Sequence, residues 1–141
     1  MTTLSFMKPS FFALALSFVL LIGCSTTTSA DKKVSDGETV LITYRVKPGS
    51  EAEFEQVLAE AWKTYRAEKL VFASPHIITS DKDGGGKPRF VEIFTWVSPS
   101  APDHAPDSVK KIWAQMMSLC EKRDGHGGLE GGEVEIVGSP K

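Results

Sequence analysis

The sequence lacks the residue patterns that build metal centres, nucleophilic active sites and nucleic-acid interfaces. Its three histidines, His76, His104 and His126, do not have the spacing of metal ligands, so we expect no metal site. It contains neither a nucleophile elbow nor a phosphate-binding loop that leads into a helix. Its 16 basic and 18 acidic residues give a net charge of −2, whereas a nucleic-acid-binding protein needs a basic face. We therefore expect no nucleic-acid partner.

The first 23 residues have the pattern of a bacterial export signal. Lys8 supplies a positive charge, and residues 11–22 form an apolar run that is too short to span a bilayer as a retained helix. Residues 21–24 (Leu-Ile-Gly-Cys) resemble the bacterial lipobox. This resemblance implies that the signal is cleaved before Cys24, that the Cys24 thiol carries diacylglycerol and that the new amine carries a fatty-acyl chain such as palmitate. The alternative is ordinary secretion, with Cys24 an incidental part of the signal.

A lipid anchor of this kind predicts a protein of the bacterial cell envelope. Two or three acyl chains bind a membrane stably where one does not, because each buried methylene contributes about 0.8 kcal/mol. Ser25 stands where, in Gram-negative lipoproteins, an Asp marks retention in the inner membrane, so we expect an outer-membrane protein facing the periplasm. With Cys24 lipidated, Cys120 is the only thiol left. We therefore expect no intramolecular disulfide and a buried Cys120.

The rest of the chain divides into a tether at residues 24–37, a single domain at residues 38–137 and a tail at residues 138–141. Within the domain, alternating apolar residues predict strands, and apolar residues at helical spacing predict helices. Ser50 and Glu53 have the spacing of a capping box. The expected elements are a strand at 38–47, a helix at 50–68, a strand within 71–80, a strand at 89–98, a helix capped by Asp107 or Ser108 that ends at 123, and a strand at 133–137 after a flexible glycine connection at 127–132.

The order strand, helix, strand, strand, helix, strand predicts an α+β domain of the ferredoxin-like split βαβ type. In this topology the first and third strands are central in a four-stranded antiparallel sheet, and both helices cover one face. The third strand carries Phe90, Phe94 and Trp96 on one face but also Val91 and Ile93 on the other. An uncovered apolar face is unusual in a monomer, so we expect a homodimer packed sheet to sheet.

Residues 38–137 resemble the dimeric α/β-barrel superfamily, and within it the antibiotic-biosynthesis-monooxygenase-like (ABM) group. Members carry a Glu on the third strand, an aromatic residue shortly after it and a His at the start of the second helix. The corresponding residues here are Glu92, Phe94 or Trp96, and His104. The resemblance implies a dimeric α/β barrel and the oxygenation of a small aromatic or quinol-like compound without a permanently bound redox cofactor.

His104 and Glu92 are the candidate catalytic residues. A neutral imidazole at a helix entrance could accept a substrate proton; alternatively, His104 is a surface residue bonded to Asp103 or Asp107. Desolvation on an aromatic strand face favours the neutral form of a carboxyl group and would suit Glu92 to acid or base chemistry. Alternatively, Glu92 forms a structural pair with Arg45 or with a neighbouring hydroxyl group.

Tyr44, Phe94, Trp96 and Trp113 are the candidate ligand-binding residues. Together with Trp62, the two other tryptophans could line a flat cavity suited to an aromatic ligand. The alternative is that these rings are simply part of the core.

Two functions remain open from the sequence. The first is an envelope lipoprotein whose ABM-like domain oxygenates an aromatic compound that His104 positions or deprotonates. The second is a non-catalytic module that binds a hydrophobic ligand or a partner at the envelope. The haem-degrading members of the group also use an Asn on the first strand, and residues 41–45 contain none. The missing Asn argues against haem degradation, although Trp96 and His104 match that branch, and the resemblance to the group as a whole implies no bound cofactor.

Overall fold

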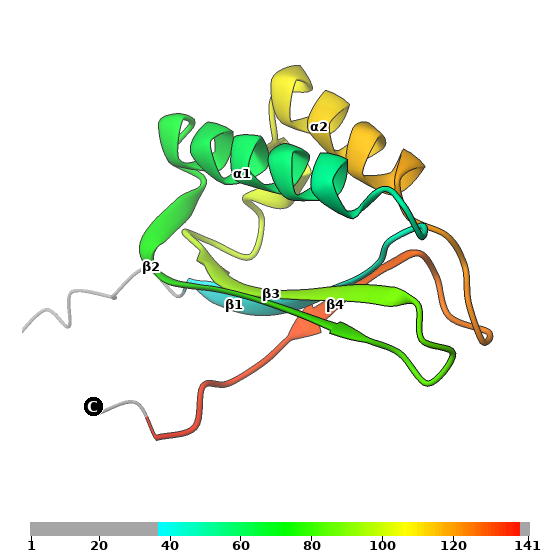
Figure 1. Ribbon diagram of the computed structural model, residues 1–141. Coiled ribbons are helices and arrows are strands. Elements are labelled where there is room, and N and C mark those ends of the chain that lie inside the picture. Colours follow the sequence, from blue (N-terminus) through cyan, green and yellow to red (C-terminus); the bar gives the residue numbers. More distant parts are fainter. Residues whose placement is uncertain (1–36, 139–141) are drawn as a thin grey trace, which may run out of the picture. The chain divides into compact units, whose positions relative to one another are not determined.

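The computed structural model describes residues 37–138 (Figure 1). The expected export signal and Cys24 lie outside these residues. The elements follow in the order β1 (Glu38–Arg45), α1 (Glu51–Ala67), β2 (Val71–Lys82), β3 (Pro88–Trp96), a short 3-10 turn at Pro102–His104, α2 (Asp107–Ser118) and β4 (Leu129–Glu133). None of the described helices is both long enough and apolar enough to span a membrane.

The four strands form one antiparallel sheet in the order β2, β3, β1, β4. Figure 1 shows α1 and α2 together on one face of this sheet. The central strands are therefore β1 and β3, and the predicted ferredoxin-like split βαβ fold is confirmed. Pro75 lies on the edge strand β2, as expected for a residue without an N–H group to donate to a central ladder.

The core lies between the sheet and the two helices. α1 is amphipathic because Phe54, Leu58, Ala61 and Tyr65 recur every three or four residues, and all four are buried. They pack against the alternate residues of β1 and β3 that face the helices. Each large apolar side chain buried in this way contributes about 1.5–3 kcal/mol. The same packing brings aromatic rings from both layers into contact.

The sheet face away from the helices is apolar and open. Leu41 on β1, Ile93 on β3 and Ile77 on β2 are cross-strand neighbours on this face. Leu41 and Ile93 are half-buried, and Ile77 is 46% exposed. Figure 1 shows no helix on this side of the sheet. The expectation that β3 presents apolar side chains on both faces is confirmed.

α2 is shorter than the sequence pattern predicts. It ends at Ser118, and Cys120 lies beyond it in an isolated bridge with Val46. The helix stops because the chain turns back toward β1, where the Glu121 N–H donates to the Arg45 carbonyl oxygen at 2.9 Å. Cys120 is buried as predicted, but it reaches the core through this contact rather than from a helix.

Neither helix start has the predicted side-chain cap. Ser50 precedes α1, but its backbone (φ −103°, ψ 8°) is not extended and its hydroxyl group makes no cap bond, so no capping box forms with Glu53. α2 begins at Asp107 directly after Pro106, again with no side-chain cap bond. The predicted caps are wrong, although both helices begin close to the expected positions.

The fourth strand also differs from the prediction. The sequence predicts it at residues 133–137, whereas β4 is the glycine-containing segment before them. These glycines are not a flexible connection, because a Cβ atom at Gly131 would collide with the Ile42 side chain on β1. Gly131 and Gly132 instead pair with Ile42 and Leu41 of β1 as part of the sheet, and the missing side chain at Gly131 leaves room for the end of the Ile42 side chain. Beyond it, Val137 is 93% exposed.

Candidate functional site

A mostly apolar cavity of about 280 Å³ lies between the sheet and α2. We call it the aromatic cavity, and it is lined by Ile42, Tyr44, Tyr65, Phe94, Trp96, Pro102, Trp113, Met116, Met117 and Leu129. Met117 is 62% exposed, which places an opening to solvent near the C-terminal end of α2. A concave apolar site with a few polar groups is the usual form of a small-molecule site.

All four predicted ligand-binding residues line the aromatic cavity. Tyr44 comes from β1, Phe94 and Trp96 from β3, and Trp113 from α2. The rings of Phe94 and Trp96 lie edge to face with their centroids 4.9 Å apart, and those of Trp96 and Trp113 are 6.4 Å apart. Such pairs stabilise a core by about 0.5–1.5 kcal/mol each. The rings therefore act as core, and ligand binding by them stays a prediction.

A polar cluster of Tyr44, Glu92 and His76 extends from the cavity wall. Glu92 on β3 is 1% exposed, and both adjacent strands supply a partner for it. The Tyr44 hydroxyl donates to Glu92 Oε2 at 2.7 Å. The other carboxylate oxygen, Glu92 Oε1, lies 2.9 Å from His76 Nε2. Both oxygens of the buried carboxylate therefore have a hydrogen-bond partner.

His76 connects this cluster to the surface. Its imidazole lies flat on the Trp62 ring of α1, with the centroids 3.5 Å apart and the planes 11° apart. Its side chain is 19% exposed. The polar cluster thus runs from Tyr44 at the cavity wall, through buried Glu92, to a residue that solvent can reach. This is the geometry of a proton path between the cavity and water.

Buried Glu92 is held by hydrogen bonds rather than by a lysine or arginine of the described residues. Burial, followed by the negative charge of Glu92, raises the pKa of Tyr44 above its ordinary value, so its hydroxyl remains a donor at neutral pH. Within residues 37–138 no Lys or Arg pairs with Glu92, and Arg45 instead forms an ion pair with Glu130 at 3.0 Å. The two groups that bond Glu92 are therefore a tyrosine hydroxyl and an imidazole.

His104 lies apart from both the cavity and the polar cluster. It is exposed, and its Nδ1–H donates to the Ser100 carbonyl oxygen at 2.9 Å rather than to a neighbouring aspartate. Pro102 of the same 3-10 turn lines the cavity, but His104 does not. The structure therefore does not bring the two candidate catalytic residues together, and Glu92 is the one connected to the cavity.

Sequence reasoning missed two polar residues of this site, His76 and Tyr65. The register between β2 and β3 shifts between Val71 and His76, and simple alternation cannot place a residue that follows such an irregularity. Tyr65 falls on the apolar stripe of α1, which predicts burial but not a hydrogen bond of its hydroxyl group. The available signal in the sequence was a tyrosine at a core position, because its buried hydroxyl group needs a hydrogen-bond partner.

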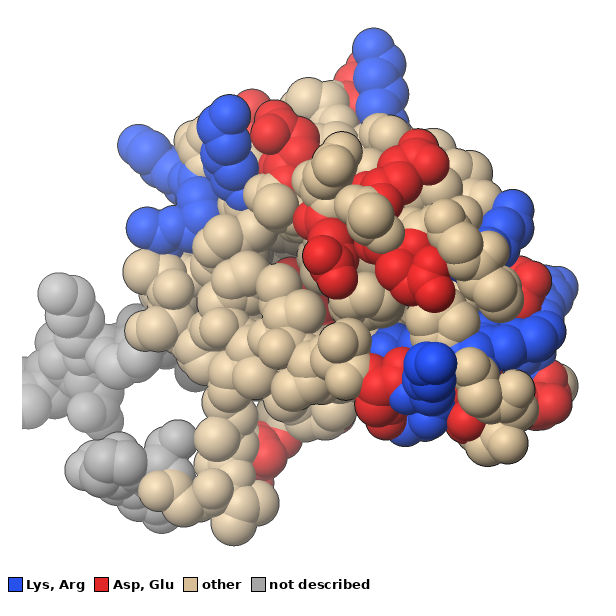
Figure 2. Space-filling model, viewed as in Figure 1, with Lys and Arg blue, Asp and Glu red and all other residues tan. Residues whose placement is uncertain are grey.

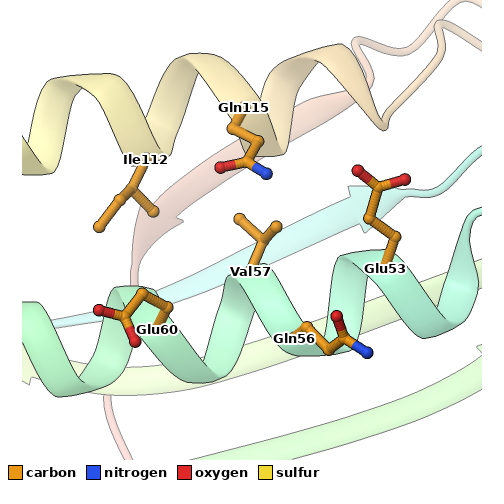
Figure 3. Close-up of a pocket in the computed structure, with 6 residues that line it drawn as sticks. All are labelled: Glu53, Gln56, Val57, Glu60, Ile112 and Gln115. Atoms are coloured by element: carbon orange, nitrogen blue, oxygen red, sulfur yellow. The ribbon is translucent and has the colours of Figure 1, made fainter.

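A second hollow, of about 300 Å³, lies between α1 and α2 (Figure 3). It is lined by Glu53, Gln56, Val57, Glu60, Ile112 and Gln115. Val57 and Ile112 point into the space between the helices, but carboxylate and amide groups surround them. Figure 2 shows acidic side chains gathered on this face of the molecule. This second hollow therefore suits an apolar aromatic molecule less well than the aromatic cavity does.

Within residues 37–138, no group of three or more His, Cys, Asp or Glu side chains is arranged to hold a metal ion.

No protein-family model and no curated protein sequence matches the chain. Solved structures do match it in fold. A mutant of SnoaB, described as a cofactor-independent oxygenase from Streptomyces nogalater, is 19% identical over 74% of this chain and 96% of that chain, with a TM-score of 0.55. A putative antibiotic biosynthesis monooxygenase from Caulobacter crescentus is 21% identical over 74% of this chain and 92% of that one, with a TM-score of 0.54.

A third structure is described as a dimeric ferredoxin-like protein of unknown function from Jannaschia sp.. It is 13% identical over 71% of this chain and 99% of that chain, with a TM-score of 0.50. At such identities the likeness shows the fold alone. The described domain therefore has the ferredoxin-like fold seen in antibiotic-biosynthesis-monooxygenase-like proteins.

Proposed function

We propose that the domain oxygenates a small aromatic or quinol-like compound without a bound redox cofactor, with Glu92 acting as a base through Tyr44. The observation that carries this proposal is the continuous chain of hydrogen bonds from Tyr44 at the cavity wall, through buried Glu92, to His76 at the surface. The fold supports it, because one structural neighbour is described as a cofactor-independent oxygenase.

The proposed reaction begins at an activated methylene group of the aromatic substrate. The Tyr44 oxygen takes a proton from this carbon while the Tyr44 proton passes to Glu92, so no free tyrosinate is formed. The substrate anion adds O2 at the same carbon, and return of the proton gives a hydroperoxide. A second deprotonation at that carbon breaks the O–O bond and expels water. O2 then supplies one atom to the new carbonyl and one to water, and the substrate supplies all four electrons.

Oxygen uptake by the purified protein tests this proposal. A panel of anthrones and naphthols, which carry an activated methylene group in their keto forms, serves as substrates. Glu92→Gln should lower turnover by about 10²–10⁴-fold, the range of a lost general base. Glu55→Gln on the exposed face of α1 is the matched control, and His104→Ala should also retain turnover because His104 lies outside the cavity. Unchanged turnover in Glu92→Gln would contradict the proposal.

A non-catalytic ligand-binding module is the second candidate. The observation that favours it is that both oxygens of Glu92 already have partners within the protein. Under this alternative an aromatic compound binds in the cavity, but the wild-type protein consumes no oxygen with any compound of the panel. Binding without turnover would therefore select the second candidate over the first.

The open sheet face supports a homodimer. Leu41, Ile77 and Ile93 would be covered by the same face of a second copy, and one structural neighbour is described as dimeric. We expect light scattering to give the mass of a dimer at micromolar concentration and Ile93→Glu to give a monomer. The control is Lys63→Glu on the exposed side of α1. A monomeric wild type would contradict the proposal.

The N-terminal sequence supports anchoring of the domain to the periplasmic face of the outer membrane through lipid on Cys24. Cells grown with labelled palmitate should yield a labelled protein in the outer-membrane fraction. Cys24→Ser should lose both the label and the membrane association, whereas Cys120→Ser should keep them. Label that persists in Cys24→Ser would exclude this site of acylation.

A further inference from the structure

One hydrogen-bonded pair, Tyr65 and Trp113, lies in the wall of the aromatic cavity. Trp113 Nε1–H donates to the Tyr65 hydroxyl oxygen at 2.6 Å, and both side chains line the cavity. Tyr65 is only 3% exposed, so solvent does not bond its hydroxyl freely. The pair joins α1 to α2 and is separate from the hydrogen bonds of Glu92.

The hydrogen bonds of this pair leave one donor unused. An indole N–H can only donate, whereas a tyrosine hydroxyl both accepts and donates. The bond from Trp113 therefore occupies an acceptor site on the Tyr65 oxygen and leaves the hydroxyl proton available. Within residues 37–138, no acceptor takes that proton. The Tyr65 oxygen therefore has a partner while its proton remains free, and in the wall of a cavity such a proton can bond an acceptor on a ligand.

Tyr65 differs in this respect from Tyr44, the other tyrosine of the cavity. The Tyr44 proton is already donated to Glu92. Burial raises the pKa of Tyr65, so its hydroxyl also remains protonated at neutral pH. In addition, the bond from Trp113 polarises the Tyr65 hydroxyl and makes it a stronger donor. Tyr65 is therefore the donor in this wall that is free to bond a bound molecule.

The remaining walls restrict what that molecule can be. Phe94, Trp96 and Met116 offer aromatic and thioether surfaces, which suit a flat ring system. A volume of about 280 Å³ is at the small end of ligand sites and has room for about two or three fused rings. The Tyr65 hydroxyl is a single donor in this wall, so it matches a ligand that carries one acceptor oxygen on the edge of its ring system.

We propose that Tyr65, held and polarised by Trp113, binds the carbonyl oxygen of a fused aromatic ketone or quinone, and that the cavity selects such compounds over hydrocarbons of the same shape. This inference rests on the proposed function only because both use the aromatic cavity. It adds the class of compound that the cavity binds. The carbonyl is also the group that the proposed oxygenation produces, so the selected compound is a product or a carbonyl-bearing substrate.

Fluorenone and fluorene provide a matched pair of probes, because they share a flat three-ring shape and differ by one carbonyl oxygen. Binding of each to the purified full-length protein is measured by equilibrium dialysis. We expect the wild type to bind fluorenone at least about tenfold more tightly than fluorene. Tyr65→Phe should reduce this ratio at least about tenfold, with the fluorene affinity unchanged within about twofold, because only the hydroxyl is lost.

Two further variants make the test specific. Glu55→Gln, on the exposed face of α1, is the control and should leave the fluorenone to fluorene ratio unchanged. Trp113→Phe keeps a ring at this position but removes the polarising donor, so it should reduce the ratio by a smaller factor than Tyr65→Phe. This variant also keeps the inference testable if Tyr65→Phe does not fold, which thermal unfolding will reveal.

The outcomes separate this inference from the proposed function. A ratio that is the same in the wild type and in Tyr65→Phe overturns the inference even if turnover depends on Glu92. Failure of the wild type to bind either compound overturns it as well. A Tyr65-dependent ratio in a protein that consumes no oxygen supports the inference and rejects the proposed oxygenation.

Discussion

Glu92 and Arg123 are the two charged side chains buried within residues 37–138, and the structure satisfies them in different ways. Arg123 is 7% exposed and Glu92 is 1% exposed. A buried charge is costly unless it is paired and hydrogen-bonded, so each of them requires local compensation. The kind of compensation differs, and the difference indicates which of the two is structural and which is available for chemistry.

Arg123 is held by groups that do not titrate at neutral pH. It donates to Asp83 Oδ2 at 2.7 Å and to the carbonyl oxygens of Val46 and Pro88 at 3.1 and 2.7 Å. These bonds join the segment after α2 to the end of β1 and to the turn between β2 and β3. Glu92, in contrast, is balanced by a tyrosine hydroxyl and an imidazole. Arg123 therefore holds the fold together, whereas Glu92 connects Tyr44 in the cavity wall to His76 near the surface.

The largest expected effect comes from breaking the Arg123 contacts. Arg123→Ala leaves Asp83 and two carbonyl oxygens without their partner and should lower the free energy of unfolding by about 3–5 kcal/mol. Urea unfolding measures this loss. Lys122→Ala, at the exposed neighbouring position, should change the free energy of unfolding by no more than about 0.5 kcal/mol. A loss below about 1 kcal/mol in Arg123→Ala would contradict the structural role.

A smaller effect on stability is expected at Glu92. Glu92→Leu leaves the Tyr44 hydroxyl and the His76 imidazole without a partner and should lower the free energy of unfolding by about 1–3 kcal/mol. Glu92→Gln can still accept from Tyr44 and donate to neutral His76, so its loss should stay below about 1 kcal/mol. Urea unfolding of both variants gives the comparison. Equal losses would show that the carboxylate charge, rather than its hydrogen bonds, matters for folding.

Asp83 gives the Arg123 contacts a dependence on pH. Hydrogen bonding from the Lys87 N–H is the largest cause that lowers the pKa of Asp83 below its ordinary value of 3.8, and Gly85 and Arg123 add to it. Because the folded pKa is lower than the unfolded one, this stabilisation is present above pH 3.8 and is lost as the pH falls through the folded pKa.

The midpoint of thermal unfolding, followed across the acid range, tests this dependence. Asp83→Asn should be less stable than the wild type at neutral pH, and the difference between the two should shrink as the medium becomes strongly acidic. Asp124→Asn at a nearby exposed position is the control and should follow the wild type. A difference that stays constant at every pH would exclude the ionised Asp83 as the source.

The smallest expected effect concerns the reactivity of the Cys120 thiol, which lies near Arg123. Burial is the main cause that raises the pKa of Cys120 to about 11, so the thiol is protonated and unreactive at neutral pH in the folded protein. In a Cys24→Ser background, maleimide labelling of Cys120 should be slow. Arg123→Ala should accelerate it because the contacts around Cys120 open more often, whereas Glu92→Gln should not. Equal acceleration by both variants would remove the distinction between the two regions.

The sequence predicted the parts of the fold that depend on regular periodicity. Alternation identified β1 and β3, the apolar stripe identified α1, and the order of elements gave the sheet topology. It also predicted that Tyr44, Phe94 and Trp96 would line the cavity, because they face the helices from central strands. The expectation that Trp62 joins them is wrong, because its ring stacks on His76 instead. These features depend on local spacing, which is visible in one chain.

Features that depend on long-range register were not predicted. The contact between His76 and Glu92 requires the register of β2 after an irregularity, and the end of α2 is decided by the pairing of Cys120 with Val46. The sequence places β4 too late in the chain because its glycines read as a flexible connection, although Gly131 and Gly132 pair with Ile42 and Leu41 of β1. In each case the deciding contact joins residues that are distant in the sequence.

Gly131 also limits how the shape of the aromatic cavity can change. Any substitution there would push the Ile42 side chain, which lines the cavity, away from its present position. Mutations of Gly131 can therefore shift one wall of the cavity without altering a residue that lines it, but they cannot enlarge the cavity by removing side-chain atoms, because glycine has none. A larger cavity has to come from shortening other side chains, and Ile42 is the one nearest to Gly131.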